Sequence, residues 1–150
     1  MSEIDVTNKH EHHWFKQHDG IWEGTYVVFN ARSGQIIDQF HSKLTCKQLN
    51  DNDYHQTNEY TWSDGRTLVK EFPGQFRDGE LYFDNSQLSG RTYQVNSKTM
   101  IFAWKYKEKD DESYSEIITL ENPIHRCRTW QHFKGGEFIK ITVIDEKKVA

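Results

Sequence analysis

From Gly20 onwards, apolar and polar residues alternate with a period of two, and residues typical of turns interrupt the alternation again and again. A period of two is the repeat of a β-strand, whose successive side chains point to opposite faces of a sheet. Pro73-Gly74, Asp78-Gly79 and Gly135-Gly136 are among the interruptions. The pattern predicts ten strands, at residues 21–30, 36–49, 54–62, 66–72, 80–83, 88–95, 99–107, 113–120, 126–133 and 138–144.

The short connections favour an up-and-down order in which neighbours along the chain pair in space. Such a meander leaves two exposed edges unless its first and last strands meet, and closure removes both edges. We therefore predict an all-β fold, an up-and-down antiparallel β-barrel of about eight to ten strands, over residues 10–150. Residues 1–9 are expected to be a flexible tail, and residues 10–18 a short helix anchored by Trp14 and Phe15.

Alternation also predicts which side chains face the interior. One face of the strand at 54–62 carries three aromatic and two amide side chains, namely Tyr54, Gln56, Asn58, Tyr60 and Trp62. The strand at 99–107 presents Met100, Phe102, Trp104 and Tyr106. Alternation leaves the inner face of the strands at 113–120 and 126–133 undecided, although the large ring of Trp130 favours an inward direction for Trp130 and Arg128.

A buried arginine needs a partner, because an isolated charge is costly to remove from water. Glu116 is the expected partner of Arg128 if their two strands are neighbours. The pair is then either structural, or part of a wet cavity in which Arg128 holds an anionic group of a ligand through its bidentate fork. The sequence leaves both interpretations open.

Composition narrows the class of protein. The 150 residues suit one domain, and five Trp, seven Tyr and nine Phe argue against disorder. The net charge of −4 and the lack of a basic cluster argue against nucleic acid as a partner. The polar N-terminus and the absence of a long apolar run predict no signal peptide and no membrane span, so we expect a cytoplasmic protein, either a monomer or a weak homodimer.

The cysteine and histidine residues give little support for a metal site or for a catalytic nucleophile. His10, His12 and His13 lie in the N-terminal segment, where adjacent histidines cannot share one helix face, so no metal site is predicted there. Cys46 and Cys127 lack Cys-x-x-Cys spacing and are expected to be reduced thiols, although a disulfide between them stays open. His125 and Cys127 share one face of their strand, which is only suggestive of a catalytic pair.

The segment Gly20-Ile21-Trp22-Glu23-Gly24-Thr25-Tyr26 resembles the Gly-x-Trp signature that opens lipocalins and other calycins. The resemblance implies a lipocalin-like barrel in which Trp22 closes one end and an arginine from a late strand packs across it. Arg126 and Arg128 are the two candidates for that arginine, and Arg126 is assigned to barrel closure.

A wider resemblance is carried by Trp14-Phe15, by Phe29 with Ser33-Gly34, by the segment Arg126-Cys127-Arg128-Thr129-Trp130-Gln131, and by Ile144-Asp145-Glu146. These residues are similar to a calycin-like family of unknown function that is common in cyanobacteria. That family resembles the S-type phycobilin lyases, which attach bilins to cysteines of phycobiliproteins. The resemblance implies a barrel and, more loosely, a small ligand such as a bilin, but no residue motif specific to lyase activity occurs.

Three hypotheses about function follow. In the first, which we favour, the barrel binds a small, largely hydrophobic molecule with a polar or anionic group, and no other cofactor is expected. In the second, the same cavity performs lyase or isomerase chemistry, such as attachment of a bilin to an acceptor protein, with Glu116 and Arg128 as candidate catalytic residues. In the third, a ligand-free barrel serves as an interaction module. The proposed ligand-binding residues are Tyr26, Asn58, Tyr60, Trp62, Phe102, Trp104, Glu116, Arg128 and Trp130.

Overall fold

The structure of the protein, a computed structural model, describes residues 13–150. The tail predicted for residues 1–9 and the first part of the predicted helix lie outside these residues. A short helix, α1, spans His13–Lys16. The prediction of helix as far as His18 is wrong, because His18 N–H bonds to the Phe15 carbonyl at 2.9 Å and Asp19 N–H to the Lys16 carbonyl at 3.0 Å. These bonds close a tight turn, which ends the helix and leads the chain into the first strand.

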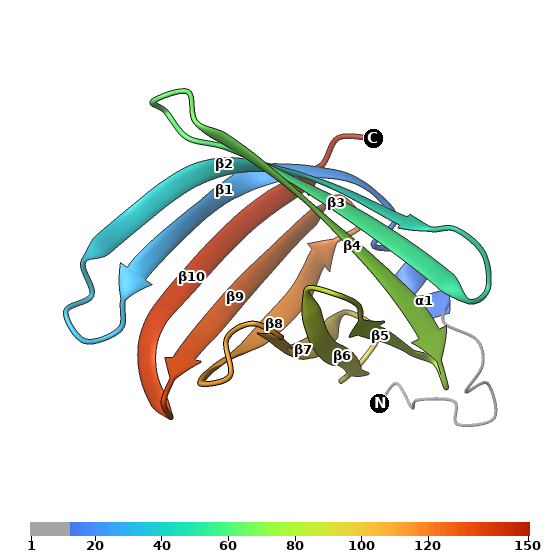
Figure 1. The fold of residues 1–150 in the computed structure, drawn as a ribbon. Helices are drawn as coiled ribbons and strands as arrows, with labels where there is room; N and C mark the ends of the chain where they lie inside the picture. Colours follow the sequence, from blue (N-terminus) through green and yellow to red (C-terminus); the bar gives the residue numbers. More distant parts are fainter. Residues whose placement is uncertain (1–12) are drawn as a thin grey trace.

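Ten antiparallel strands form one closed barrel in the order β1-β10-β9-β8-β7-β6-β5-β4-β3-β2 (Figure 1). Each strand pairs with its neighbour in the chain, and pairing of the first strand with the last closes the ring. The predicted all-β, up-and-down barrel is therefore confirmed. The strands are β1 (Gly20–Asn30), β2 (Ile36–Gln48), β3 (Asp53–Thr61), β4 (Thr67–Arg77), β5 (Glu80–Asp84), β6 (Leu88–Gln94), β7 (Thr99–Tyr106), β8 (Glu112–Asn122), β9 (His125–Lys134) and β10 (Glu137–Lys148).

Two strand ends differ clearly from the prediction. β4 continues through Pro73 and Gly74, where the sequence predicted a stop. Pro73 is tolerated because β5 pairs with β4 only over Gln75–Arg77, so one side of β4 has no strand partner at Pro73. β10 runs to Lys148 instead of ending at residue 144, and β1 pairs with it over the added length.

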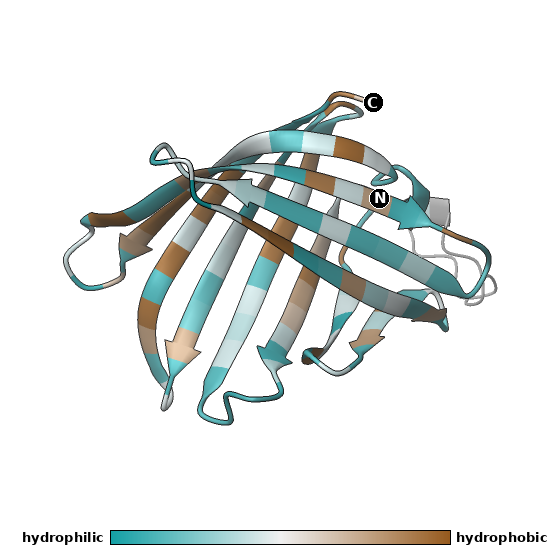
Figure 2. Ribbon diagram, turned by 45° about the horizontal axis from the view of Figure 1, so that its top comes forward, coloured by the Kyte–Doolittle hydropathy of each residue, from teal (hydrophilic) through white to brown (hydrophobic). Residues whose placement is uncertain are grey.

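The residues inside the barrel follow the predicted alternation, and Figure 2 shows hydrophobic and hydrophilic residues mixed along the strands. The side chains of Tyr54, Asn58 and Tyr60 on β3 are buried, as are those of Met100 and Trp104 on β7. The two undecided faces are now resolved. The residues buried on β8 are Glu116, Ile118 and Leu120, and those on β9 are Arg126, Arg128 and His132.

One end of the barrel is closed by α1, which lies beside the C-terminal end of β4 (Figure 1). Phe15 packs edge-to-face on Tyr54 and Phe76, with ring centroids 5.2 and 5.4 Å apart. Trp22 is fully buried and donates from its indole nitrogen to the His18 carbonyl at 2.9 Å. These aromatic contacts fix a very short helix that has too few internal hydrogen bonds to persist alone.

Candidate functional site

Four charged side chains meet inside the barrel. Arg128 on β9 donates to Glu146 on β10 at 2.7 Å and to Glu116 on β8 at 2.8 Å. Arg126, two residues earlier on the same face of β9, also donates to Glu146. All four side chains are at most 5% exposed, so each charge depends on the others for its stabilisation.

The cluster is balanced in charge and uses nearly all the donors of Arg128. One of its terminal nitrogens bonds to Glu116 and the other to the Tyr26 hydroxyl, while its Nε bonds to Glu146. Burial raises the pKa of Glu116 despite the attraction of Arg128. Burial acts in the same sense on Glu146, but Arg126 and Arg128 together outweigh it and lower the pKa of that carboxyl. Glu116 is therefore the carboxylate of the cluster that takes up a proton first.

Arg126 links the charge cluster to the closed end. Its guanidinium lies over the Trp22 ring, 4.4 Å from the centroid, and donates to His18 Nδ1 at 2.9 Å. Burial, followed by repulsion from Arg126, holds the pKa of His18 well below its usual range, so this imidazole is neutral. Of the two arginines that the sequence offered for packing on Trp22, the structure places Arg126 there and Arg128 deeper among the carboxylates.

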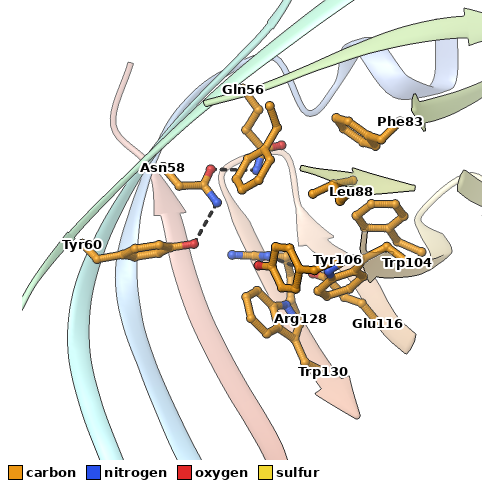
Figure 3. A pocket seen from close by; sticks show the side chains of 12 residues that line it. Gln56, Asn58, Tyr60, Phe83, Leu88, Trp104, Tyr106, Glu116, Arg128 and Trp130 are labelled. Carbon is orange, nitrogen blue, oxygen red and sulfur yellow. Dashed lines mark hydrogen bonds and ion pairs between the residues drawn. The ribbon is translucent and has the colours of Figure 1, made fainter. Parts of the chain in front are cut away.

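A row of polar side chains runs along the inner face of β3 (Figure 3). Tyr54 donates to Gln56 over 2.8 Å. Gln56 donates to Asn58 and Asn58 donates to Tyr60, each over 2.8 Å, and Figure 3 shows these two bonds. Each amide nitrogen has two N–H groups, and these bonds use one of them. The second N–H of Gln56 and of Asn58 is therefore not used within the row, although both side chains line the interior.

Beside this row is a cavity of about 50 Å³ (Figure 3). One water molecule needs roughly 10–15 Å³ by this measure, so the cavity has room for a few waters. A second cavity of about 50 Å³ lies towards the closed end, between Phe15 and Arg128. Aromatic rings fill most of the remaining interior, and those that line the first cavity belong to Tyr60, Phe72, Phe83, Phe102, Trp104, Tyr106 and Trp130.

The indole N–H of Trp130 is the unusual polar group of this cavity. The nitrogen is buried and makes no hydrogen bond of ordinary geometry, although the Glu116 carboxylate across the strand pair lies near enough for the N–H to act on its pKa. The Trp130 ring packs edge-to-face on Trp104 at 5.2 Å and on Tyr26 at 5.4 Å, which fixes its direction. Because a buried donor without a well-placed acceptor is costly, this position favours an acceptor atom from a bound molecule or water.

Seven of the nine ligand-binding residues predicted from the sequence line the cavity, namely Asn58, Tyr60, Phe102, Trp104, Glu116, Arg128 and Trp130. The other two do not line it. Tyr26 lies behind Arg128 and accepts its hydrogen bond. Trp62 directly follows the last residue of β3, where it packs on Phe40 and donates to Asp38 at 3.0 Å. Their predicted role in ligand binding stays a prediction.

Sequence reasoning missed two charged residues of the interior. Glu146 carries part of the family resemblance, but its position inside the barrel was not predicted because the predicted last strand ended at 144, although period two places Glu146 on the same face as Ile144. Lys70 lies on the inner face of β4, with its ammonium group 5.1 Å from the centre of the Tyr106 ring. Burial lowers the pKa of Lys70, and within residues 13–150 no ion pair involves it.

Both cysteines are free thiols on opposite faces of the barrel wall. Cys46 is buried and accepts a long hydrogen bond from Arg126 at 3.9 Å. Cys127 lies on the outer face of β9, between the inward-pointing Arg126 and Arg128. The disulfide that the sequence left open is therefore not formed. His10 and His12 of the histidine run lie outside the described residues.

Among the described residues, no helix has the length and apolar character needed to cross a bilayer. The fold and site together define a closed ten-stranded antiparallel β-barrel with a small internal cavity and a buried, balanced charge cluster. A family model described as domain of unknown function (DUF3598), N-terminal, matches residues 9–150. The chain belongs to this family, which confirms the resemblance seen in the sequence. No curated protein matches the chain.

Solved structures with the same fold include a DUF3598 protein of unknown function from Nostoc punctiforme, with a TM-score of 0.72 and 14% identity. The match covers 99% of this chain and 51% of that protein, so the chain spans about half its length. The S-type phycobiliprotein lyase CPES from Guillardia theta has a TM-score of 0.73 and 13% identity, over 99% of both chains. Rv2717c from M. tuberculosis has a TM-score of 0.65 and 9% identity, over 92% of this chain and 98% of that chain. At these identities the likeness shows a shared fold.

Proposed function

We propose that the barrel binds one small, largely apolar molecule that carries a polar group. The observation that supports this most directly is the buried N–H of Trp130, a residue of the cavity wall, because this N–H makes no hydrogen bond of ordinary geometry and has only the nearby Glu116 carboxylate as an acceptor. The spare amide N–H groups of Gln56 and Asn58 lie in the same wall, and aromatic rings supply the rest. A few convergent polar groups in an aromatic cavity are typical of small-molecule sites.

The polar end of the ligand is expected to lie near Lys70 rather than at Arg128. The guanidinium of Arg128 is already paired with Glu116 and Glu146, so an anionic group there would leave a carboxylate unpaired. Lys70 is inward-facing, half-buried and beside Tyr106, which lines the cavity. A carboxylate or sulfonate at this position would gain a cationic partner without disturbing the charge cluster.

Ligand entry requires aromatic side chains to turn. The cavity of about 50 Å³ is far smaller than the roughly 300–1,000 Å³ of a drug-sized site. The side chains of Trp62, Tyr106 and Tyr114 are only half-buried and lie away from the end that α1 closes. Rotation of Tyr106, which lines the cavity, would join the cavity to the outside and enlarge it, because this ring is not locked by full burial.

The test uses 1-anilinonaphthalene-8-sulfonate, which combines an aromatic body with one sulfonate, and molecules that co-purify with the protein from its native cells. Native mass spectrometry should find one molecule per barrel. Trp130→Phe removes the N–H and keeps most of the ring, so it should weaken binding about 5- to 10-fold, since a hydrogen bond is worth on the order of 1 kcal/mol. Trp14→Phe is the matched control, because the Trp14 N–H already bonds to the Gly79 carbonyl and the ring does not line the cavity. Equal affinities of the two variants would contradict the proposal, and no bound molecule at all would favour the interaction module.

Lyase or isomerase chemistry is a second candidate function for the same cavity. It is supported by Glu116, a carboxyl in the cavity wall whose pKa burial raises, which suits a general acid, and by the fold shared with CPES. A bilin and an acceptor phycobiliprotein would be the substrate and the partner. Incubation of all three should yield bilin covalently bound to the acceptor, and Glu116→Gln should remove this product while bilin binding persists. Bilin binding without any transfer would contradict the lyase function and support ligand binding only.

We also propose a monomeric or weakly dimeric state, because one barrel contains the whole site, and a cytoplasmic location, which rests on the sequence alone. Cell fractionation and sedimentation at several protein concentrations would test them. A tight oligomer whose size does not change with protein concentration would contradict the proposed monomeric or weakly dimeric state.

A further inference from the structure

Three side chains with metal-binding atoms meet on the outer face of the barrel, on the side of the sheet opposite to the charge cluster. Cys127 on β9 lies directly across from Asp145 on β10, and His125 lies two residues before Cys127 on the same face. The Cys127 sulfur is 3.9 Å from His125 Nε2 and 3.9 Å from Asp145 Oδ1, and His125 Nε2 contacts that same carboxylate oxygen. All three ligand atoms lie within 4.8 Å of one another.

The arrangement is not that of a catalytic Cys–His–Asp relay. In such a relay the carboxylate binds one ring nitrogen of the histidine and the thiol faces the other. Here Cys127 and Asp145 both face Nε2 of His125. Three donor atoms that converge on one point do not pass a proton along a chain, but they can share a single cation placed between them.

We propose that His125, Cys127 and Asp145 form a site for a divalent transition-metal ion of the zinc class. Sulfur and imidazole nitrogen are the ligands that zinc prefers, and they exclude magnesium and calcium, which take oxygen ligands. Zinc bound tetrahedrally at about 2.3 Å from sulfur and 2.0–2.1 Å from nitrogen or oxygen sets those atoms about 3.6 Å apart. Both sulfur distances in the structure, 3.9 Å, are close to this value. Only the His125–Asp145 contact must widen, by rotation of the exposed Asp145.

The charges also match a divalent cation. A thiolate and a carboxylate carry two negative charges, and a neutral imidazole adds none. An ordinary cysteine thiol has a pKa of about 8.5 and so holds its proton at neutral pH. Binding therefore breaks the S–H bond, releases one proton to water and forms the sulfur–metal bond, while the oxidation state of the metal is unchanged.

The backbone holds the three residues in place, and solvent can reach them. Cys127 pairs with Asp145 on β10 and with Thr119 on β8, so the Cα positions of Cys127 and Asp145 are fixed by the closed barrel. The side chains of His125 and Asp145 are 30% and 68% exposed. Three protein ligands leave the fourth tetrahedral position to water, which is the form of an open rather than a closed zinc site.

Cobalt(II) is the probe that tests the site, because a cysteine ligand gives cobalt a sulfur-to-metal charge-transfer band in the near ultraviolet. The protein used is the full chain with His10→Ala, His12→Ala and His13→Ala, so that the N-terminal histidines do not compete. One equivalent of cobalt should give this band together with the intense visible bands of tetrahedral cobalt, and zinc should displace it. Cys127→Ser should remove the charge-transfer band, and His125→Ala and Asp145→Asn should each weaken binding at least 10-fold.

His41→Ala is the matched control. His41 and Glu23 form an imidazole–carboxylate pair at 3.3 Å on the same outer surface, without a sulfur atom. This variant should bind cobalt as the parent does, and thermal unfolding should show that all variants are folded. The proposal is overturned if stoichiometric cobalt gives no sulfur-to-metal band, or if the band survives in Cys127→Ser.

Discussion

Arg128 and Glu146 form the centre of the buried charge cluster, joined by Nε–Oε1 and Nη2–Oε2 contacts of 2.7 and 3.4 Å between neighbouring strands. Glu146 also forms an ion pair with Arg126, so this one carboxylate balances two guanidinium groups. Glu116 forms an ion pair with Arg128 alone. The two glutamates should therefore differ in their importance for stability.

Glu146→Gln should lower the free energy of unfolding by about 3–5 kcal/mol, since it leaves buried positive charge without compensation. Glu116→Gln should cost less, because burial already favours the neutral form of this side chain. Urea unfolding at pH 7 measures both values. Glu23→Gln is the control, because its exposed pair with His41 is expected to contribute about 0–1 kcal/mol. A larger loss for Glu116→Gln than for Glu146→Gln would contradict this reading of the cluster.

The dependence of stability on pH should reflect the protonation of the His18 imidazole. Burial and Arg126 lower its pKa in the folded protein far below the ordinary 6.5, so the folded form keeps a neutral imidazole. As the pH falls through about 6.5, the unfolded chain binds a proton that the folded protein cannot bind, and stability is lost. His18→Gln keeps a hydrogen-bond acceptor for Arg126 but cannot titrate. Urea midpoints between pH 8 and pH 5 should therefore fall less steeply for the variant than for the parent, and equal slopes would refute the assignment.

Gly24 allows β1 and β10 to approach each other beside Glu146. A Cβ atom at this position would lie 2.0 Å from the Asp145 carbonyl oxygen and 2.7 Å from the Glu146 Cα. These are mainly backbone atoms of a closed barrel, so they cannot move away cheaply. Gly24→Ala should lower the thermal midpoint and cost about 1–3 kcal/mol or more. Thr25→Ala, on the neighbouring exposed position, should change stability by no more than about 0.5 kcal/mol.

Lys70 should control the preference for anionic ligands. Lys70→Gln should weaken binding of 1-anilinonaphthalene-8-sulfonate about 2- to 5-fold, which is the effect of losing one partly screened charge. Binding of an uncharged naphthalene analogue should not change, and the effect should shrink as salt is added. Lys47→Gln, which removes an exposed lysine from β2, serves as the control. If both ligands lost affinity equally, Lys70 would be acting through packing instead of charge.

The fold could be predicted from the sequence because alternation and turns are local signals. Tyr54, Asn58 and Tyr60 lie inside as their period of two indicates, and the ten strands follow one another around the ring. The passage of β4 through Pro73 could not be predicted, since it depends on how far β5 happens to pair with β4. A local pattern does not contain the length of a neighbouring strand.

The candidate site was only partly predictable for the same reason. The Arg128–Glu116 pair was expected, because each residue sits at an alternating position of a strand next to the other. Whether Arg126 or Arg128 packs on Trp22 depends on three-dimensional register, which connects residues 22 and 126 across the barrel. The convergence of Asp145 with His125 and Cys127 needed the register of β10 against β9, and the predicted last strand stopped one residue short of it.

The position of α1 has a consequence for exchange rates. The side chains of Phe15, Tyr54 and Phe76 fill one end of the barrel, so the interior is open at the other end only. A bound molecule must therefore leave through the same opening by which it entered. A side chain that only obstructs this opening slows arrival and departure by the same factor. Tyr106 also lines the cavity, so its removal should shorten the residence time of a bound molecule both by widening the opening and by taking away contacts with that molecule.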